Sequence, residues 1–124
     1  KLIKGVGMMN LIDNRPISSG PARMWTFVIL YMRPPNAEDF LQDYKSVHVP
    51  FGKRFPHLQR WTISVADTAE EGSDEVFMIS TLYFNSLDEL RQALKSPERA
   101  TAFEDSKRFQ HYQLGRYVCE VTDV

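Results

Sequence analysis

The sequence predicts an α+β domain with the element order β-α-β-β-α-β, in which four strands form one antiparallel sheet and both helices cover one face. Two observations predict this class. Runs rich in β-branched and aromatic residues alternate with segments of helical periodicity. The second half of the chain also repeats the strand–helix–strand order of the first half. This order is the split βαβ, or ferredoxin-like, pattern, and a chain of 124 residues fits one such domain.

The first strand is predicted over residues 24–32, which form an unbroken β-branched and aromatic run. The run is apolar at both odd and even positions, which is typical of a strand that is covered on both faces. Arg33-Pro34-Pro35 ends it. Asn36 then has the side chain of a helix N-cap, and Glu38 and Asp39 suit the positive end of a helix dipole.

The first helix is predicted to run to about residue 46 or 47, because its apolar residues follow helical spacing at Phe40, Leu41, Tyr44 and Val47. Residues 47–56 contain two prolines, and we expect a semi-rigid connection in which Pro50 stops the helix. Residues 58–66 predict the second strand, with Trp61, Ile63 and Val65 on one face.

The second half opens with a third strand over residues 76–84, after a polar loop at 67–74. Ser86 and Glu89 form a capping box that begins the second helix. Ser96 followed by Pro97 marks the start of a further helical segment, because serine caps and proline suits the first helical position. Residues 117–121 alternate in polarity and predict the last strand, with Tyr117, Cys119 and Val121 on one face.

The chain divides at residue 23. Residues 1–23 hold three of the six glycines and two of the seven prolines, and they lack a periodic apolar face. We interpret this segment as an N-terminal arm or an expression remnant. Residues 24–124 are the predicted α+β domain.

The two-faced apolar strands predict a second subunit. The helices cover one face of the sheet, so the other face needs a partner, and a single domain of this length offers none. A second copy of the same sheet would supply it. The sequence therefore predicts a homodimer in which two sheets form a dimeric α+β barrel, with a pocket for a small apolar ligand.

Charge and composition exclude several classes. Fifteen basic and sixteen acidic residues give a net charge of −1, whereas proteins that bind nucleic acid or membrane surfaces are typically basic. There is a single cysteine, so no intrachain disulfide can form. No apolar run approaches the roughly 18 residues of a membrane span, and the opening residues form a poor secretory signal. We expect a cytoplasmic protein with no membrane and no nucleic-acid partner.

The RNA-recognition domain shares this element order and is the alternative to test. Such a domain carries basic, glycine and aromatic residues on its third strand. Here the third strand, residues 76–84, contains neither glycine nor a basic residue. No nucleotide-binding glycine motif is present either, and the histidines do not have the spacing of a local metal site. The sequence thus predicts no cofactor and no metal.

Two short motifs follow the first helix: His48-x-Pro50, and a Pro-x-Leu-x-Arg run from Pro56 to Arg60 that begins eight residues after the histidine. With them, in order, occur Leu30-Tyr31-Met32-Arg33-Pro34, Phe40, Tyr44, Leu82-Tyr83-Phe84-Asn85-Ser86-Leu87, Ala93-Leu94, Ser96-Pro97-Glu98, and Asp105 four residues before Phe109. Over roughly residues 24–122 this ordered set resembles the EthD family.

The resemblance implies the dimeric ferredoxin-like barrel that the pattern already predicts, and it leaves the reaction open. The family is named after a protein encoded with a cytochrome P450 system that degrades a fuel ether. Relatives in the wider barrel group include isomerases, polyketide cyclases, dehydratase-like members and cofactor-free monooxygenases. The resemblance therefore implies cofactor-free chemistry on small compounds.

His48 is the candidate catalytic residue. Imidazole titrates near neutral pH and can shuttle protons, and His48 matches the family's His-x-Pro position. The alternative is a structural histidine that bonds a backbone carbonyl at a helix end. Asp105, which matches the family's late helix, is expected either to contact the segment that holds His48 or to be an exposed carboxylate.

Four further residues are candidates for substrate binding. Tyr31, Trp61 and Tyr83 are strand aromatics that could donate hydrogen bonds into a pocket, although ordinary packing also explains them. Arg60 could bind a substrate carboxylate or form a salt bridge at the dimer edge.

Two function classes remain. The first is a cofactor-free enzyme that acts by proton transfer on a small apolar or aromatic compound, as an isomerase, cyclase or lyase of a catabolic or secondary-metabolite pathway. The second is a non-catalytic accessory or ligand-binding protein of an oxidative degradation pathway. A cofactor-free monooxygenase would use the same residues as the first.

Overall fold

The computed structural model describes residues 23–73 and 75–124. The predicted arm, residues 1–23, lies outside this part apart from Arg23, and the proposed division at residue 23 stays a prediction. The elements are, in order, β1 (Met24–Met32), α1 (Ala37–Asp43), η2 (Tyr44–His48), α2 (Val49–Gly52), β2 (Arg60–Val65), β3 (Val76–Phe84), α3 (Leu87–Leu94), α4 (Pro97–Ser106), η3 (Lys107–Tyr112) and β4 (Gln113–Val121).

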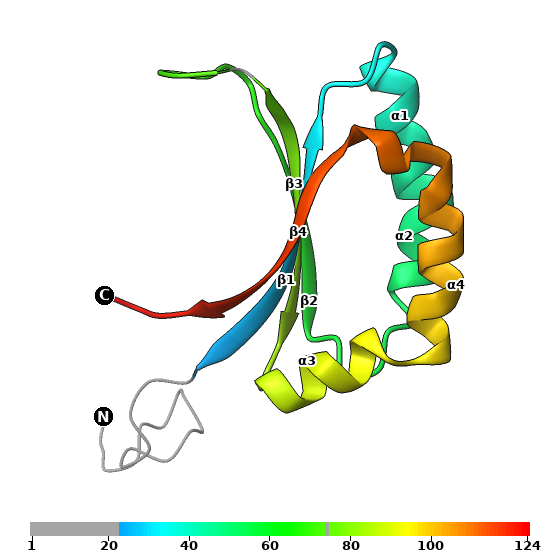
Figure 1. Cartoon of the computed structure of the whole chain (residues 1–124), viewed down its shortest axis with the longest axis vertical. Helices are drawn as coiled ribbons and strands as arrows, with labels where there is room; N and C mark the ends of the chain where they lie inside the picture. Colours follow the sequence, from blue (N-terminus) through cyan, green and yellow to red (C-terminus); the bar gives the residue numbers. More distant parts are fainter. Residues whose placement is uncertain (1–22, 74) are drawn as a thin grey trace, which may run out of the picture.

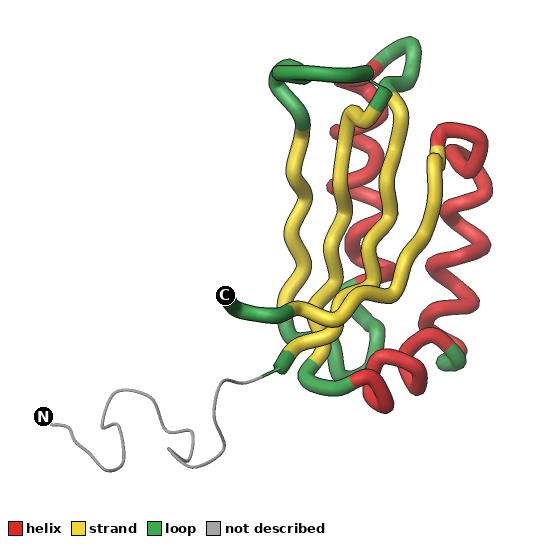
Figure 2. The backbone as a smooth tube through the Cα atoms, turned by 60° about the vertical axis from the view of Figure 1, so that its left-hand side comes forward, coloured by secondary structure: helices red, strands yellow, loops and turns green. Residues whose placement is uncertain are grey.

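The four strands form one sheet in the order β2-β3-β1-β4, and every neighbouring pair is antiparallel. All helical segments pack on one face of this sheet, which Figure 1 shows edge-on with the helices to its right. Figure 2 shows the four strands side by side with the helices beyond them. The structure confirms the predicted α+β fold and its strand–helix order.

The buried core lies between the sheet and the helices. Along β1 and β3, the register places alternate residues of both strands on the helix side, where the pairs Phe27–Leu82, Ile29–Ser80 and Tyr31–Met78 face each other. Each of these six residues is buried. Burying such aromatic and aliphatic side chains is the main favourable contribution to folding.

The first helix departs from the prediction, because it does not stop before Pro50. A π-helical turn, η2, follows α1, and the Val49 N–H donates to the Tyr44 carbonyl five residues back. Pro50 then occupies the first turn of α2, where its missing N–H has little cost. The helix ends at Gly52, where a Cβ atom would overlap the Trp61 ring.

The predicted caps of the other helices are present. The Ser86 side chain accepts a hydrogen bond from the Glu89 N–H, and the Ser96 side chain accepts one from the Arg99 N–H. The last strand is longer than predicted and starts at Gln113, while β2 is shorter and covers Arg60–Val65.

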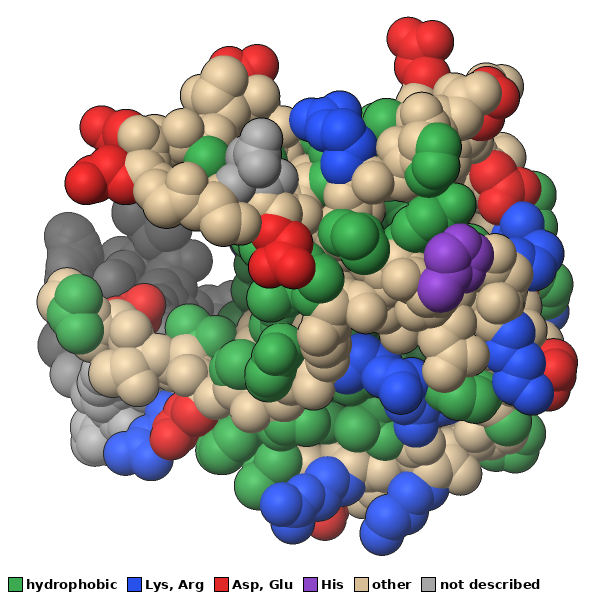
Figure 3. Space-filling view, turned by 45° about the horizontal axis from the view of Figure 1, so that its top comes forward, with side chains coloured by type: hydrophobic (Ala, Val, Ile, Leu, Met, Phe, Trp, Pro, Cys, Tyr) green, Lys and Arg blue, Asp and Glu red, His purple; other side chains and the backbone are tan. Residues whose placement is uncertain are grey.

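The other face of the sheet carries apolar side chains without a helix over them. Ile79, Met32 and Val121 each expose more than a third of their surface there, and Tyr117 exposes 50%. The β2–β3 hairpin and the end of β4 both curve toward this open side (Figure 1). In Figure 3, which brings the top of the Figure 1 view forward, hydrophobic side chains also reach the surface across the middle of that view.

Within residues 23–73 and 75–124, no helix has the length and apolar character needed to span a membrane.

Candidate functional site

A small cavity lies between the sheet and the helices, and His48 lines it. Its volume is about 40 Å³. Aromatic and aliphatic side chains from β1 and α4 form most of the wall, and polar groups come from Tyr31, Gln113, Arg99 and Arg116. A space of this size holds water molecules rather than a ring compound. A larger ligand therefore requires the wall to open.

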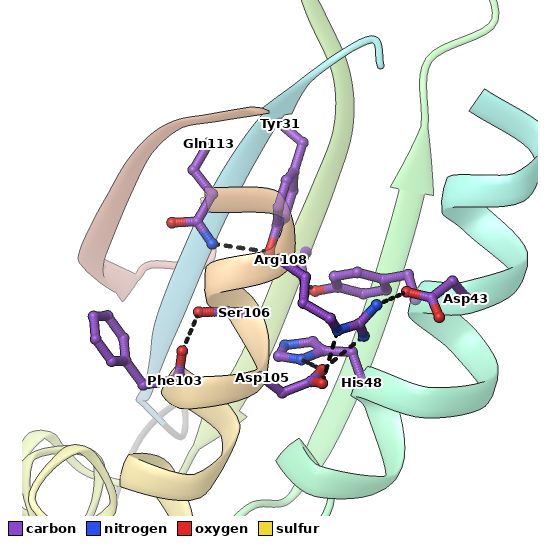
Figure 4. A network of polar contacts seen from close by, with 10 residues as sticks. Tyr31, Asp43, His48, Phe103, Asp105, Ser106, Arg108 and Gln113 are labelled. Atoms are coloured by element: carbon purple, nitrogen blue, oxygen red, sulfur yellow. Dashed lines mark hydrogen bonds and ion pairs between the residues drawn. The ribbon is translucent and has the colours of Figure 1, made fainter. Parts of the chain in front are cut away.

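His48 is held in one orientation by Asp105. Its Nδ1 atom lies 2.9 Å from Asp105 Oδ2 on α4, as the dashed line in Figure 4 marks. Both side chains are largely buried, with exposed fractions of 7% and 13%. An ionised carboxylate can only accept a hydrogen bond, so the Nδ1–H of His48 donates to it. This tautomer leaves the Nε2 lone pair free to accept a proton.

Arg108 keeps Asp105 ionised. Its Nε donates to Asp105 Oδ1 and its Nη2 to Asp105 Oδ2, each at 3.0 Å, and its Nη1 donates to Asp43 on α1. Partial burial raises the pKa of Asp105, but the hydrogen bonds and charges of Arg108 and His48 outweigh it and hold that pKa below 3.8. Figure 4 shows this series of contacts from Asp43 to His48.

The environment of His48 favours the neutral imidazole. Burial lowers the pKa of His48 below its ordinary value of 6.5, even though the hydrogen bond and charge of Asp105 act in the opposite direction. The ring also lies 5.0 Å from that of Phe109, edge to face, and 5.0 Å from that of Tyr44. His48 is therefore a buried neutral base in an aromatic setting.

A second set of hydrogen bonds fixes the phenols beside the cavity. The Tyr44 hydroxyl donates to Ser80 Oγ at 3.0 Å, and the Trp61 indole N–H donates to the same oxygen at 2.8 Å. The Tyr31 hydroxyl accepts from Gln113 at 3.3 Å and lies 3.5 Å from the Tyr44 hydroxyl. The last distance is long for an O–H···O hydrogen bond, so the Tyr31 proton is available to a better acceptor.

Burial also keeps both phenols protonated. It raises the pKa of Tyr31 above 10, against the opposing hydrogen bonds of Tyr44 and Gln113. It raises the pKa of Tyr44 further. A neutral phenol can donate a hydrogen bond to an oxygen that gains negative charge.

The structure separates the predicted site residues into two groups. His48 and Tyr31 line the cavity together, and Trp61 packs near His48 at a ring distance of 6.5 Å. Tyr83 and Arg60 are paired across β2 and β3 on the opposite, open face, where the Arg60 guanidinium lies 5.3 Å from the Tyr83 ring centre. A ligand in the cavity does not meet them.

Sequence reasoning missed Arg108, which supports Asp105, and the polar groups Gln113, Arg99 and Arg116 of the cavity wall. The Asp105–Arg108 spacing of three residues on a helix was an available signal, since such residues are neighbours on the helix surface. The others come together only through the tertiary fold. In the described part of the chain, no three His, Cys, Asp or Glu residues cluster as a metal site would require.

The comparisons with known proteins agree with this fold. A family model described as the EthD domain matches residues 34–111. An uncharacterised 11.0 kDa protein from the thcB-thcC intergenic region of Rhodococcus erythropolis is 30% identical over 86 residues, which cover 69% of this chain and 84% of that protein. The crystal structure of an EthD family protein from Bacillus halodurans superimposes with a TM-score of 0.69 at 18% identity, covering 82% of this chain and 99% of the other.

More distant solved structures share the fold alone. A hydroxynitrile lyase from Passiflora edulis has a TM-score of 0.57 at 14% identity and covers 84% of this chain and 98% of its own. SnoaB from Streptomyces nogalater, a cofactor-independent oxygenase, has a TM-score of 0.53 at 14% identity, covering 84% and 95%. A dimeric ferredoxin-like protein from Bacteroides fragilis has a TM-score of 0.57 at 12% identity, covering 83% and 98%.

The buried neutral His48 should make folding stability depend on pH. Because its pKa is lower in the folded state, the unfolded chain binds more protons as the pH falls through about 6.5, and stability drops. His48→Gln has no imidazole at this position to protonate, so its free energy of unfolding should fall less between about pH 7.5 and pH 5.5. Urea unfolding at both pH values measures the difference. Asp105 titrates below this window, so equal losses in the two proteins would contradict the burial of a neutral His48.

Proposed function

The chain belongs to the EthD domain family, and on this basis we propose that it is a cofactor-free enzyme in which His48 moves a proton on a small apolar or aromatic compound. The reaction would be an isomerisation, a ring closure or an elimination. The observation that carries this proposal is the pairing of a base and an acid at one cavity. His48, oriented by Asp105, lines the same space as the protonated phenol of Tyr31.

The geometry supports a simple division of roles. His48 Nε2 takes a proton from a carbon acid of the substrate, and the Tyr31 hydroxyl donates a hydrogen bond to the substrate oxygen that gains charge. Asp105 stabilises the imidazolium that forms and is a positioning residue, since it contacts His48 and not the cavity. Such a base contributes about 10²–10⁴-fold to a rate.

Two neighbours of the same fold are enzymes that support this proposal, and the name of one of them describes a cofactor-independent reaction. SnoaB is a cofactor-independent oxygenase, and the Passiflora edulis protein is a hydroxynitrile lyase. An oxygenase would consume O₂, whereas an isomerase, cyclase or lyase would not.

One observation favours a second candidate, a ligand-binding accessory protein. The His48 ring is packed edge to face against Phe109 and hydrogen-bonded to Asp105, as a structural histidine would be. In this case the protein would bind a compound without transferring its protons.

We also propose that the protein is a homodimer that pairs through the open face of the sheet. The exposed apolar side chains on this face would cost free energy in water, and the curved hairpin and β4 give the face a concave shape (Figure 1). The Bacteroides fragilis neighbour is described as dimeric. In such a dimer, Tyr83 and Arg60 would lie at the subunit interface.

Proton transfer is testable without knowing the substrate. The protein is incubated in D₂O with a panel of cyclic ketones and phenols, and NMR follows deuterium uptake at carbon. We expect exchange with at least one compound, about 10²–10⁴-fold slower in His48→Ala and also slowed in Asp105→Asn, which disturbs the imidazole tautomer. O₂ consumption is measured in parallel.

His57→Ala is the matched control, because His57 is exposed and lies away from the cavity. Exchange that is equal in the parent and in a folded His48→Ala would contradict the role of His48. Binding of panel compounds with no exchange and no O₂ uptake would favour the accessory protein.

Assembly is tested by one charge on the open face. Light scattering should give a mass of twice the 14.4 kDa chain at micromolar concentration. Ile79→Glu places a carboxylate in the middle of the apolar face and should shift the protein to a monomer. Burying this unpaired charge in the interface would weaken association by roughly 3–5 kcal/mol. Gln42→Glu, on the exposed side of α1, should remain dimeric. A stable monomer of the parent protein would refute the dimer.

A further inference from the structure

Two arginines meet at the outer edge of the His48 cavity. Arg99 comes from α4 and Arg116 from β4, and both line the cavity together with Phe103. The same three residues also line an adjoining surface groove of about 310 Å³, where Lys95 adds a further positive charge. The groove and the cavity are thus neighbouring spaces with a shared, positively charged border.

The two guanidinium groups are held against one aromatic ring. The Arg99 Cζ lies 5.5 Å from the centre of Phe103 and 5.6 Å from that of Phe27. The Arg116 Cζ lies 5.3 Å from Phe103. Arg99 Nη1 also donates to the Leu94 carbonyl at 3.2 Å, at the C-terminal end of α3. These contacts fix the side chains and leave other N–H groups for a ligand.

This pair of cations lacks a protein counter-charge in the described part of the chain. The ion pairs of residues 23–73 and 75–124 include no carboxylate within 4.0 Å of Arg99 or Arg116. Arg99 is half-buried, and both its burial and the charge of Arg116 lower its pKa. A like charge held nearby disfavours the charged form of a group, whereas Arg108 is neutralised by Asp43 and Asp105.

We propose that Arg99 and Arg116 bind a carboxylate of the ligand, so that the ligand is a small aromatic or alicyclic carboxylic acid. Arginine binds carboxylates through paired N–H groups. The ring of such a ligand lies against Phe103, and the remainder faces the cavity that contains His48 and Tyr31. This inference deepens the proposed function and rests on it for the role of His48.

Benzoate is the probe, and isothermal titration calorimetry is the measurement. We expect benzoate to bind the parent protein at least about tenfold more tightly than benzamide, which has the ring without the charge, and than acetate, which has the charge without the ring. Arg99→Gln and Arg116→Gln should each weaken benzoate binding by about tenfold or more. Arg91→Gln, an exposed arginine on α3, should bind benzoate as the parent does.

Arg99 packs on two aromatic rings, so Arg99→Lys is a second variant that keeps the charge if the glutamine variant does not fold. It should bind benzoate more tightly than benzamide, though more weakly than the parent does, because lysine lacks the paired N–H geometry. Four results would each overturn the proposal. The first two are equal binding of benzoate and benzamide, and binding of acetate as tight as that of benzoate. The others are no detectable binding of benzoate, and unchanged benzoate binding in both glutamine variants.

The result is separable from the test of His48. Intact, arginine-dependent binding without any proton exchange would support the carboxylate site and refute only the chemistry. Exchange with neutral ketones, without benzoate binding, would refute only the carboxylate site.

Discussion

The hydrogen bond between His48 and Asp105 is the interaction on which the candidate site depends. It joins η2 to α4 across the helical layer, at 2.9 Å and largely out of water. Its cost is offset because Arg108 neutralises Asp105 and itself reaches Asp43 on α1. The same hydrogen bond places the imidazole proton on Nδ1. One contact therefore both holds η2 against α4 and sets the tautomer that proton transfer by Nε2 requires.

The two faces of the sheet carry different kinds of side chains and contacts. The helix side holds the aromatic core, the cavity and the two sets of hydrogen bonds that fix His48 and Tyr31. The open side holds apolar side chains that have no helix over them. On the helix side, the buried Ser80 hydroxyl accepts hydrogen bonds from both Tyr44 and Trp61. The donors of both side chains are thereby paired, as buried polar groups require.

The sequence predicted the central strands and the helix starts well, because β1 and β3 are unbroken apolar runs and Ser86 and Ser96 are local signals. It predicted that the first helix ends at about residue 46 or 47, which is wrong, because the π-turn η2 (Tyr44–His48) continues the helix and Pro50 lies in the first turn of α2. It also missed the start of β4, where Gln113, Gly115 and Arg116 break the alternation. Which face Tyr31 and Tyr83 occupy depends on register, and the Arg99–Arg116 pair depends on tertiary contacts. Neither is visible in one sequence.

His48 is a neutral base whose Nδ1–H donates a hydrogen bond to Asp105. Nitrogen-15 NMR of the imidazole rings over a pH series measures both the tautomer and the pKa, with His57→Gln and His111→Gln used to assign the signals. We expect a proton on Nδ1, a free Nε2, and a His48 pKa below 6.5. A neutral form protonated on Nε2, or a His48 pKa above 6.5, would contradict this expectation.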